Sequence, residues 1–280
     1  MTQRLGIIGY PLGHSLSPRF QQAALDHLGL DVRYEAWETP VASLAQRIAS
    51  LRAADVLGAN VTVPHKEAVL PLLDAVDQEA ALMGAVNTIV HRDGRLVGYN
   101  TDGVGFLAAL DSVGFDPQGA GALLLGAGGA ARAVAFALAR HGANPLSIAN
   151  RTLDRAQRLA DEVNAVAPVA QALPLTEAAL AEVAGAYVLL VNCTSVGMRH
   201  TSTEDASPFP SGLLRRRLLV YDLVYNPPET RLLRDARAAG ARAVGGLGML
   251  VHQGAAAFEL WTGRPAPVEV MFRAAEEGLQ

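Results

Sequence analysis

Lysine is almost absent from the sequence. Lys66 is the single lysine among the 280 residues, and all other basic side chains among the 23 are arginines. A guanidinium group does not give up its proton in a protein, whereas an ammonium group can exchange one and act as an acid or a base. The bias therefore suggests that Lys66 stands where arginine cannot replace it, although one lysine could also remain by chance.

Cysteine, positive charge and long apolar runs are scarce as well. The one cysteine, Cys193, cannot form an internal disulfide, and the chain has no CxxC, HExxH or acidic calcium-loop motif, so we expect no bound metal. A net charge of -4 without a basic stripe argues against nucleic acid and against an anionic membrane as the partner. No apolar run reaches the ~20 residues that span a bilayer, and the N-terminal segment lacks the apolar core of a signal peptide. We therefore expect a cytoplasmic protein.

The chain does contain a regular alternation of short apolar runs with helical patterns, which is typical of an α/β fold. In the first part, a helix is expected to begin at Ser17-Pro18, with Ser17 as the N-cap and Pro18 as the first helical residue. Asp93-Gly94 lies between two apolar runs and predicts a β-hairpin. The predicted strands of this part are residues 5–9, 33–37, 59–63, 87–91 and 95–98, and a helix at residues 104–113 follows them.

The second part shows the pattern of a doubly wound, Rossmann-type sheet. A fully apolar strand is followed by a helix that Gly142 ends, and strands and helices then keep alternating. The predicted strands are residues 122–125, 146–149, 187–192, 218–223 and 241–244, with helices at 130–140, 153–163 and 230–239. The segment from residue 247 onward is helical and has no further strand to pair with, so it could pack on the first part. Two domains are thus expected, residues 1–103 plus 247–280 and residues 104–246.

The turn after the strand at 122–125 fits a dinucleotide-binding loop. It reads Gly126-Ala127-Gly128-Gly129-Ala130-Ala131, which satisfies G-x-G-x-x-A between a strand and a helix. Gly126 allows the tight turn, Gly128 lets a pyrophosphate approach the backbone, and Ala131 keeps the helix close to the strand. The free N–H groups and the dipole at the start of the helix attract the phosphate groups.

The end of the next strand indicates which dinucleotide is bound. NAD sites usually carry Asp or Glu at this point, which binds the ribose 2′-OH. This chain instead has Asn150-Arg151-Thr152, and Arg155 follows one helical turn later. No carboxylate is present to repel a 2′-phosphate, and two guanidinium groups could bind one. We therefore expect NADP.

Polar residues gather at the ends of the strands of the first part. Lys66 closely follows the third predicted strand, Asn87 begins the predicted hairpin, and Asp102 follows the end of that hairpin. Near the N-terminus, Ser15 and Ser17 are two residues apart, so in an extended segment their side chains would point the same way. These groups are the candidates for a polar active site.

Together these segments resemble the shikimate dehydrogenase family. The motifs that carry the resemblance occur in the family's order and cover nearly the whole chain: GYPLGHSLSP, NVTVPHK, GAVNT, GYNTDG, GAGGAARA, NRT, NCTSVGM, DLVYNP and GMLVHQGA. The resemblance implies an N-terminal α/β substrate domain with a mainly parallel sheet and a Rossmann NADP-binding domain. It also implies the reversible reduction of 3-dehydroshikimate to shikimate with NADPH, in the biosynthesis of chorismate and aromatic amino acids. The partner would then be a small molecule, and the chain a monomer or a homodimer.

The resemblance also implies roles for individual residues. Lys66 and Asp102 would form the catalytic pair. The substrate would be bound by Ser15, Ser17, Thr62, Asn87, Tyr225 and Gln253. The cofactor site would be lined by Gly126, Ala127, Gly128, Gly129, Ala130, Ala131, Arg132, Asn150, Arg151, Thr152, Arg155, Thr194, Gly246 and Met249. His14 and His65 lie near these residues, and the sequence assigns a role to neither.

The chemistry of a carbonyl reduction agrees with these residue types. A hydride that arrives at a carbonyl carbon makes an alkoxide, which needs a proton donor or a positive charge nearby, and Lys66 can supply both. Asp102 can hold the ammonium group and relay protons, and the sequence leaves open which of the two carries the transferred proton. Two alternative functions stay open: an NAD-preferring quinate/shikimate dehydrogenase, and a non-catalytic NADP-sensing regulator on the same fold.

Overall fold

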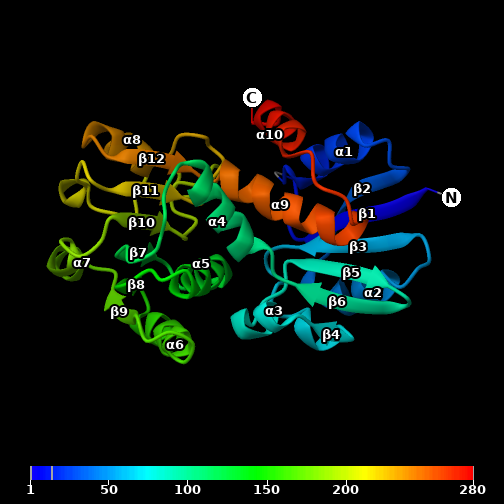
Figure 1. Cartoon of the computed structure of the whole chain (residues 1–280), viewed down its shortest axis with the longest axis horizontal. Coiled ribbons are helices and arrows are strands. Elements are labelled where there is room, and N and C mark those ends of the chain that lie inside the picture. Colours follow the sequence, from blue (N-terminus) through cyan, green and yellow to red (C-terminus); the bar gives the residue numbers. More distant parts are fainter. Residues whose placement is uncertain (1, 14, 280) are drawn as a thin grey trace. The chain divides into compact units, whose positions relative to one another are not determined.

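The computed structural model of the chain describes residues 2–13 and 15–279 and separates into two compact units (Figure 1). The first unit extends to Gly105 and resumes at Val251–Gly278, and the second is Phe106–Leu250. Within the part of the chain that the structure describes, no helix has the length and apolar character needed to cross a bilayer.

The first unit is built on a mixed sheet of six strands. These are β1 (Gln3–Gly9), β2 (Val32–Glu38), β3 (Val56–Val61), β4 (Ala75–Val76), β5 (Thr88–Arg92) and β6 (Arg95–Tyr99). Their order is β2-β1-β3-β5-β6-β4. Neighbouring strands are parallel except that β5 runs antiparallel to both β3 and β6. The ends of β3, β5 and β6 are therefore close in space, although up to 43 residues separate Val56 from Tyr99.

The predicted hairpin between β5 and β6 is confirmed. Asp93 and Gly94 both have positive φ, 53° and 77°, which is the backbone of a tight turn that matches the twist of the two strands. The turn fixes the register so that Thr88 pairs with Tyr99. This pairing brings Asn87, just before β5, next to the residues that follow β6.

Helices cover the first sheet. They are α1 (Ser17–His27), α2 (Leu44–Ser50), α3 (Gln78–Met83), the part of α9 (Leu247–Thr262) from Val251 on, and α10 (Val268–Glu277). The C-terminal segment belongs to this unit because α10 packs along α1 and Trp261 of α9 donates a hydrogen bond to the Ile89 carbonyl of β5, at 2.9 Å. Gly58 makes this approach possible, since a β-carbon there would lie 2.1 Å from the Ile89 oxygen.

The prediction that Ser17 caps α1 is wrong. The N-cap is Leu16, Ser17 is the first helical residue, and the Ser17 side chain makes no capping hydrogen bond. The Leu16 carbonyl already accepts from the backbone N–H groups of Arg19 and Phe20. Leu16 has helical φ and ψ of -82° and -12°, so the segment between Ser15 and Ser17 is not extended either.

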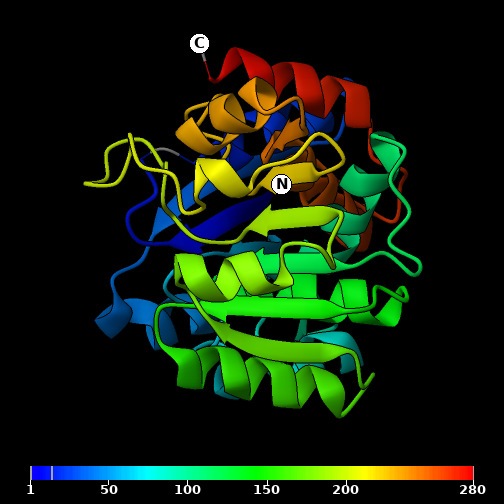
Figure 2. The same cartoon turned by 90° about the vertical axis from the view of Figure 1, so that its left-hand side faces the viewer.

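The second unit is a six-stranded, entirely parallel sheet, and the predicted α/β fold is confirmed. Its strands are β7 (Ala122–Leu125), β8 (Leu146–Asn150), β9 (Ala170–Pro174), β10 (Leu189–Asn192), β11 (Leu219–Asp222) and β12 (Arg242–Gly245). The order β12-β11-β10-β7-β8-β9 is the doubly wound arrangement, in which the winding direction reverses between β7 and β10. Figure 2 faces this unit and shows its strands side by side, coloured from green to orange.

Four helices lie wholly within the second unit, and α4 (Asp102–Ser112) enters it from the first. The four are α5 (Gly129–Arg140), α6 (Leu153–Asn164), α7 (Glu177–Val183) and α8 (Arg231–Ala238). α5 is rich in alanine and its residues from Ala133 to Ala139 are buried, as expected of a helix that lies against a sheet. In parallel doubly wound sheets, ligands bind at the carboxyl ends of the strands near the reversal point. The loops after β7, β8 and β10 therefore form the candidate cofactor site.

Candidate active site

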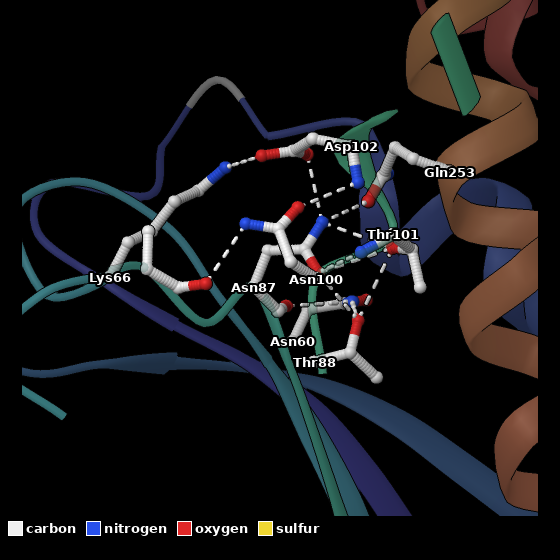
Figure 3. A network of polar contacts seen from close by, with 9 residues as sticks. Asn60, Lys66, Asn87, Thr88, Asn100, Thr101, Asp102 and Gln253 are labelled. Carbon is white, nitrogen blue, oxygen red and sulfur yellow. Dashed lines mark hydrogen bonds and ion pairs between the residues drawn. The ribbon is translucent and has the colours of Figure 1, made fainter. Parts of the chain in front are cut away.

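Lys66 and Asp102 form an ion pair in the first unit (Figure 3). Lys66 lies in the turn after β3, and Asp102 is the first residue of α4. The Lys66 Nζ donates to Asp102 Oδ2 at 2.5 Å, and the two side chains are 20% and 7% exposed. Partial burial strengthens the attraction, because less water screens the two charges. The pair still has access to solvent on the lysine side, where a substrate could reach the amine.

Asn87 holds the other oxygen of this carboxylate. Its Nδ2 donates to Asp102 Oδ1 at 2.8 Å and to Gln253 Oε1 at 3.3 Å. Its Oδ1 accepts from the Thr101 backbone N–H at 2.8 Å and from the Thr88 hydroxyl at 3.0 Å. A backbone N–H can only donate, so the Thr101 contact fixes which end of the amide is oxygen. Asn87 therefore presents its NH₂ to Asp102, and one Asp102 oxygen remains for Lys66.

The turn that carries Lys66 is fixed by its backbone and by its neighbour. The Lys66 carbonyl accepts from the Val86 N–H at 2.8 Å. His65 is fully buried, and its Nε2 lies 2.6 Å from the Thr39 carbonyl, so Nε2 carries the proton. His65 thus ties this turn to the end of β2, while His14 lies outside the described residues.

A second layer of buried polar residues supports Asn87, and sequence reasoning had assigned these residues no role. Asn60 Nδ2 donates to the Thr88 hydroxyl and to the Asn87 carbonyl, both at 3.2 Å. Asn60 Oδ1 in turn accepts from the Tyr34 hydroxyl at 2.6 Å. Asn60 and Thr88 are register partners on β3 and β5. Asn60 lies within the apolar run of β3 and Thr88 directly precedes the apolar residues of β5, and these two buried polar positions were the signal that could have revealed this layer.

The other substrate residues implied by the resemblance are more scattered. Ser17 is buried and its N–H donates to Ser15 Oγ at 3.4 Å, whereas Thr62 is half-buried just after β3. Among the described residues, no side-chain hydrogen bond joins these three to Lys66 or Asp102. Tyr225 lies in the second unit, half-buried, and burial raises the pKa of its phenol.

The turn after β7 has the shape that a pyrophosphate requires. Gly126 has a φ of +107°, and a β-carbon there would lie 3.1 Å from Thr194 Cγ2. By contrast, a β-carbon at Gly128 or Gly129 would meet no atom within 4 Å. The first backbone N–H groups of a helix have no partner within it and attract anions, and at the start of α5 the Ala131 side chain is fully buried. The loop fits a dinucleotide on the geometry of these glycines.

Two free arginines follow β8. Asn150 ends the strand and its Nδ2 donates to the Thr152 carbonyl at 2.9 Å. Arg151 and Arg155 are exposed, and neither forms an ion pair within the described residues. Arg132 differs, since it pairs with Glu162 at 2.5 Å. Both free guanidinium groups can therefore bind an anion without first breaking a contact.

The remaining predicted cofactor residues follow β10 and β12 in the chain, two of them in loops and one in a helix. Thr194 follows β10, Gly246 follows β12, and Met249 is in the first turn of α9, where its N–H donates to the Tyr221 hydroxyl at 3.2 Å. No group of three or more His, Cys, Asp or Glu side chains that could hold a metal ion occurs among the described residues.

Comparisons with known proteins agree along the whole chain. Residues 7–89 match the shikimate dehydrogenase substrate binding domain, residues 109–200 match shikimate / quinate 5-dehydrogenase, and residues 246–276 match the shikimate 5'-dehydrogenase C-terminal domain. Shikimate dehydrogenase (NADP(+)) of Moorella thermoacetica is 50% identical over 279 residues, which cover 99% of this chain and 94% of that protein. The chain belongs to the shikimate dehydrogenase family.

Solved structures support the same assignment. The shikimate 5-dehydrogenase of Thermus thermophilus, in complex with NADP(H) and shikimate, is 45% identical with a TM-score of 0.89, and the match covers 99% of this chain and 100% of that chain. A quinate dehydrogenase from Corynebacterium glutamicum in complex with NAD is 33% identical with a TM-score of 0.90, covering 99% of both chains. The fold is thus shared by enzymes that differ in substrate and cofactor.

Proposed function

We propose that the chain catalyses the reversible, NADPH-dependent reduction of 3-dehydroshikimate to shikimate, a step in the biosynthesis of chorismate and aromatic amino acids. The observation that carries the proposal is the Lys66–Asp102 ion pair, held at 2.5 Å and oriented by Asn87. Two relatives named shikimate dehydrogenase (NADP(+)), which are 50% and 49% identical over 99% and 100% of this chain, support it.

Lys66 is the proposed proton donor. NADPH, when bound, supplies a hydride to the carbonyl carbon, and the negative charge then develops on the carbonyl oxygen. The Lys66 ammonium can stabilise that charge and give its proton to the oxygen. Asp102 keeps the amine in place on one side, and the Asn87 amide keeps Asp102 from rotating away. In shikimate oxidation the same amine would accept the proton.

The substrate is a carboxylate with several hydroxyl groups, and we assign it to polar side chains. Ser15, Ser17 and Thr62 lie at the N-terminal segment and after β3, while Asn87 and Gln253 are joined by their amides. Hydroxyl and amide groups discriminate between polyols because an unmatched buried polar group is costly. Tyr225 completes this proposed set.

The cofactor is assigned to the second unit. The turn at 126–131 would bind the pyrophosphate, and Arg132 of α5 would lie beside it. Arg151 and Arg155 would bind the 2′-phosphate. Asn150, Thr152, Thr194, Gly246 and Met249 would line the rest of the site. We accordingly propose that residues 1–103 plus 247–280 bind the substrate and residues 104–246 bind NADP. A cytoplasmic location and a monomeric or homodimeric state are part of the same proposal.

Steady-state assays with two cofactors and two acids test this function. We expect NADP with shikimate to give the highest kcat/KM, and quinate to be used far less, because quinate carries an extra hydroxyl on its carboxylate-bearing carbon. Similar efficiency with quinate and NAD would instead favour the quinate/shikimate alternative. NADP binding without any turnover would favour the regulator.

Thr88→Val tests the supporting layer. The substitution keeps the shape of the side chain but removes the hydroxyl that Asn60 donates to and that donates to Asn87. One such hydrogen bond contributes about 1 kcal/mol, so we expect kcat/KM for shikimate to fall about 5- to 10-fold. Thr88→Ser keeps the hydroxyl and should stay within about threefold of the wild type.

Thr262→Val is the matched control, because the Thr262 hydroxyl donates to the Phe258 carbonyl of its own helix. It should leave kcat/KM unchanged. If Thr88→Val behaves like this control, the layer around Asn60 does not orient Asn87.

A further inference from the structure

Asp222 is a fully buried carboxylate at the end of β11. Its Oδ1 accepts from Asn192 Nδ2 at 2.8 Å and from the Val224 N–H at 3.0 Å, and its Oδ2 accepts from the Thr230 hydroxyl at 2.6 Å. No basic side chain pairs with it among the described residues. Burial raises the pKa of this carboxyl group, and the three hydrogen bonds oppose the rise. A buried carboxylate without a cation is costly, and here the cost is offset by hydrogen bonds that join Asp222 to three separate segments, those of Asn192, Val224 and Thr230.

Asn192 connects this carboxylate to the loop after β10, because its amide is hydrogen-bonded both to Asp222 and to Thr194. Asn192 ends β10 and is the register partner of Asp222. Its Oδ1 accepts from both the N–H and the hydroxyl of Thr194, at 2.9 and 2.7 Å. The Thr194 hydroxyl then accepts from the Val196 N–H at 3.2 Å. The Thr194 hydroxyl thus donates to Asn192 and accepts from Val196, and these two bonds set the orientation of its side chain.

Both ends of the segment 193–197 touch a neighbouring loop. At one end, the Thr194 side chain packs against Gly126, which forms the tight turn of the nucleotide loop. A β-carbon at Gly126 would lie only 3.1 Å from Thr194 Cγ2. Gly197 has a φ of +93°, and a β-carbon there would lie 3.3 Å from Thr230 Cβ. Thr230 is also the N-cap of α8, where its Oγ1 accepts from the Leu233 N–H. The segment is therefore held between the nucleotide turn on one side and the start of α8 on the other.

We propose that Asp222 is a positioning residue of the cofactor site, which holds the segment 193–197 against the Gly126 turn through Asn192 and Thr230. The loops on both sides of the reversal point between β7 and β10 then keep the shape that accepts the dinucleotide. Asp222 does not touch the cofactor in this account and acts only through its two partners. The inference rests on the proposed NADP dependence of this unit.

Asp222→Asn tests the proposal in the full-length enzyme. The substitution keeps size but removes the charge and replaces one acceptor oxygen with an NH₂ group, so that either the Thr230 hydroxyl loses its acceptor or Asn192 and the Val224 N–H lose theirs. We expect the dissociation constant of NADPH, measured by its fluorescence, and the KM for NADP to rise about tenfold. The KM for shikimate and kcat at saturating NADP should stay within about threefold. Asp235→Asn is the matched control, an aspartate of α8 that pairs with Arg231, and it should change none of these values.

Two substitutions at Thr230 test whether Asp222 positions the cofactor site, and they do so even if Asp222→Asn folds poorly. Thr230→Val removes the hydroxyl that donates to Asp222 and should raise the NADPH dissociation constant, whereas Thr230→Ser keeps the hydroxyl and should restore it to within about threefold. Unchanged NADPH binding in both Asp222→Asn and Thr230→Val overturns the proposal, as does an equal rise in the KM for shikimate. A wild-type chain that binds NADPH but does not oxidise shikimate contradicts the proposed function alone, and the binding assay still tests Asp222.

Discussion

Lys66→Arg is expected to lose about as much turnover as Lys66→Ala. Arginine keeps the positive charge next to Asp102 but cannot give up a proton to a carbonyl oxygen. General acid–base catalysis contributes ~10²–10⁴-fold, so kcat for shikimate oxidation should fall by about that factor in both variants. Substrate binding should change much less, because the serines and amides of the proposed site remain.

The comparison of the two variants separates two roles of the lysine. The amine lies 2.5 Å from Asp102 Oδ2, so a purely electrostatic function would be largely retained by arginine. Lys66→Arg with most of its activity would therefore reduce Lys66 to a charge that binds substrate. Asp102→Asn offers a check from the other partner. It should lower kcat as well, since the asparagine cannot hold the ammonium group by charge.

The strand pattern made most of the fold predictable. Apolar runs bounded by turn residues predicted the long central strands of both sheets. Asp93-Gly94 predicted the hairpin that brings Asn87 near Asp102. The sequence did not predict β9 or β4. β9 is a partly exposed strand at the edge of its sheet and ends in Pro174, so it lacks the continuous apolar run of a buried strand. β4 contains only two residues, too few for any periodicity.

The candidate site was predictable only as far as the motifs reach. Lys66, Asp102 and Asn87 follow strands or begin elements, and the structure joins them by direct hydrogen bonds. Sequence reasoning did not assign roles to Asn60 and Asp222, because their hydrogen-bond partners depend on the register of the strands. Each bonds to a polar residue on the neighbouring strand that is 28 or 30 positions away in the chain. The prediction that Ser17 is the N-cap was wrong for a local reason: the helix begins one residue earlier, with backbone hydrogen bonds to the Leu16 carbonyl.

Arg151→Ala should raise the KM for NADP more than the KM for NAD, and so weaken the preference for NADP without removing cofactor binding. Arg151 follows β8, is exposed and has no ion-pair partner among the described residues, so its guanidinium group is available to a 2′-phosphate. A charge-assisted contact of this kind contributes about 1.5–3 kcal/mol, which corresponds to a roughly 10- to 100-fold rise in the KM for NADP. The KM for NAD, which lacks that phosphate, should stay nearly constant.

Arg155 and Arg216 complete this experiment. If Arg155 shares the phosphate, Arg155→Ala should shift the same ratio, and the double variant should lose less than the sum of the two single losses because both groups bind one anion. Arg216 is also exposed, but it precedes β11 and so lies at the opposite, N-terminal end of the parallel strands. Arg216→Ala should therefore change neither KM. Equal losses with NADP and NAD in Arg151→Ala would show that this arginine contributes to the fold of the loop and not to the choice of cofactor.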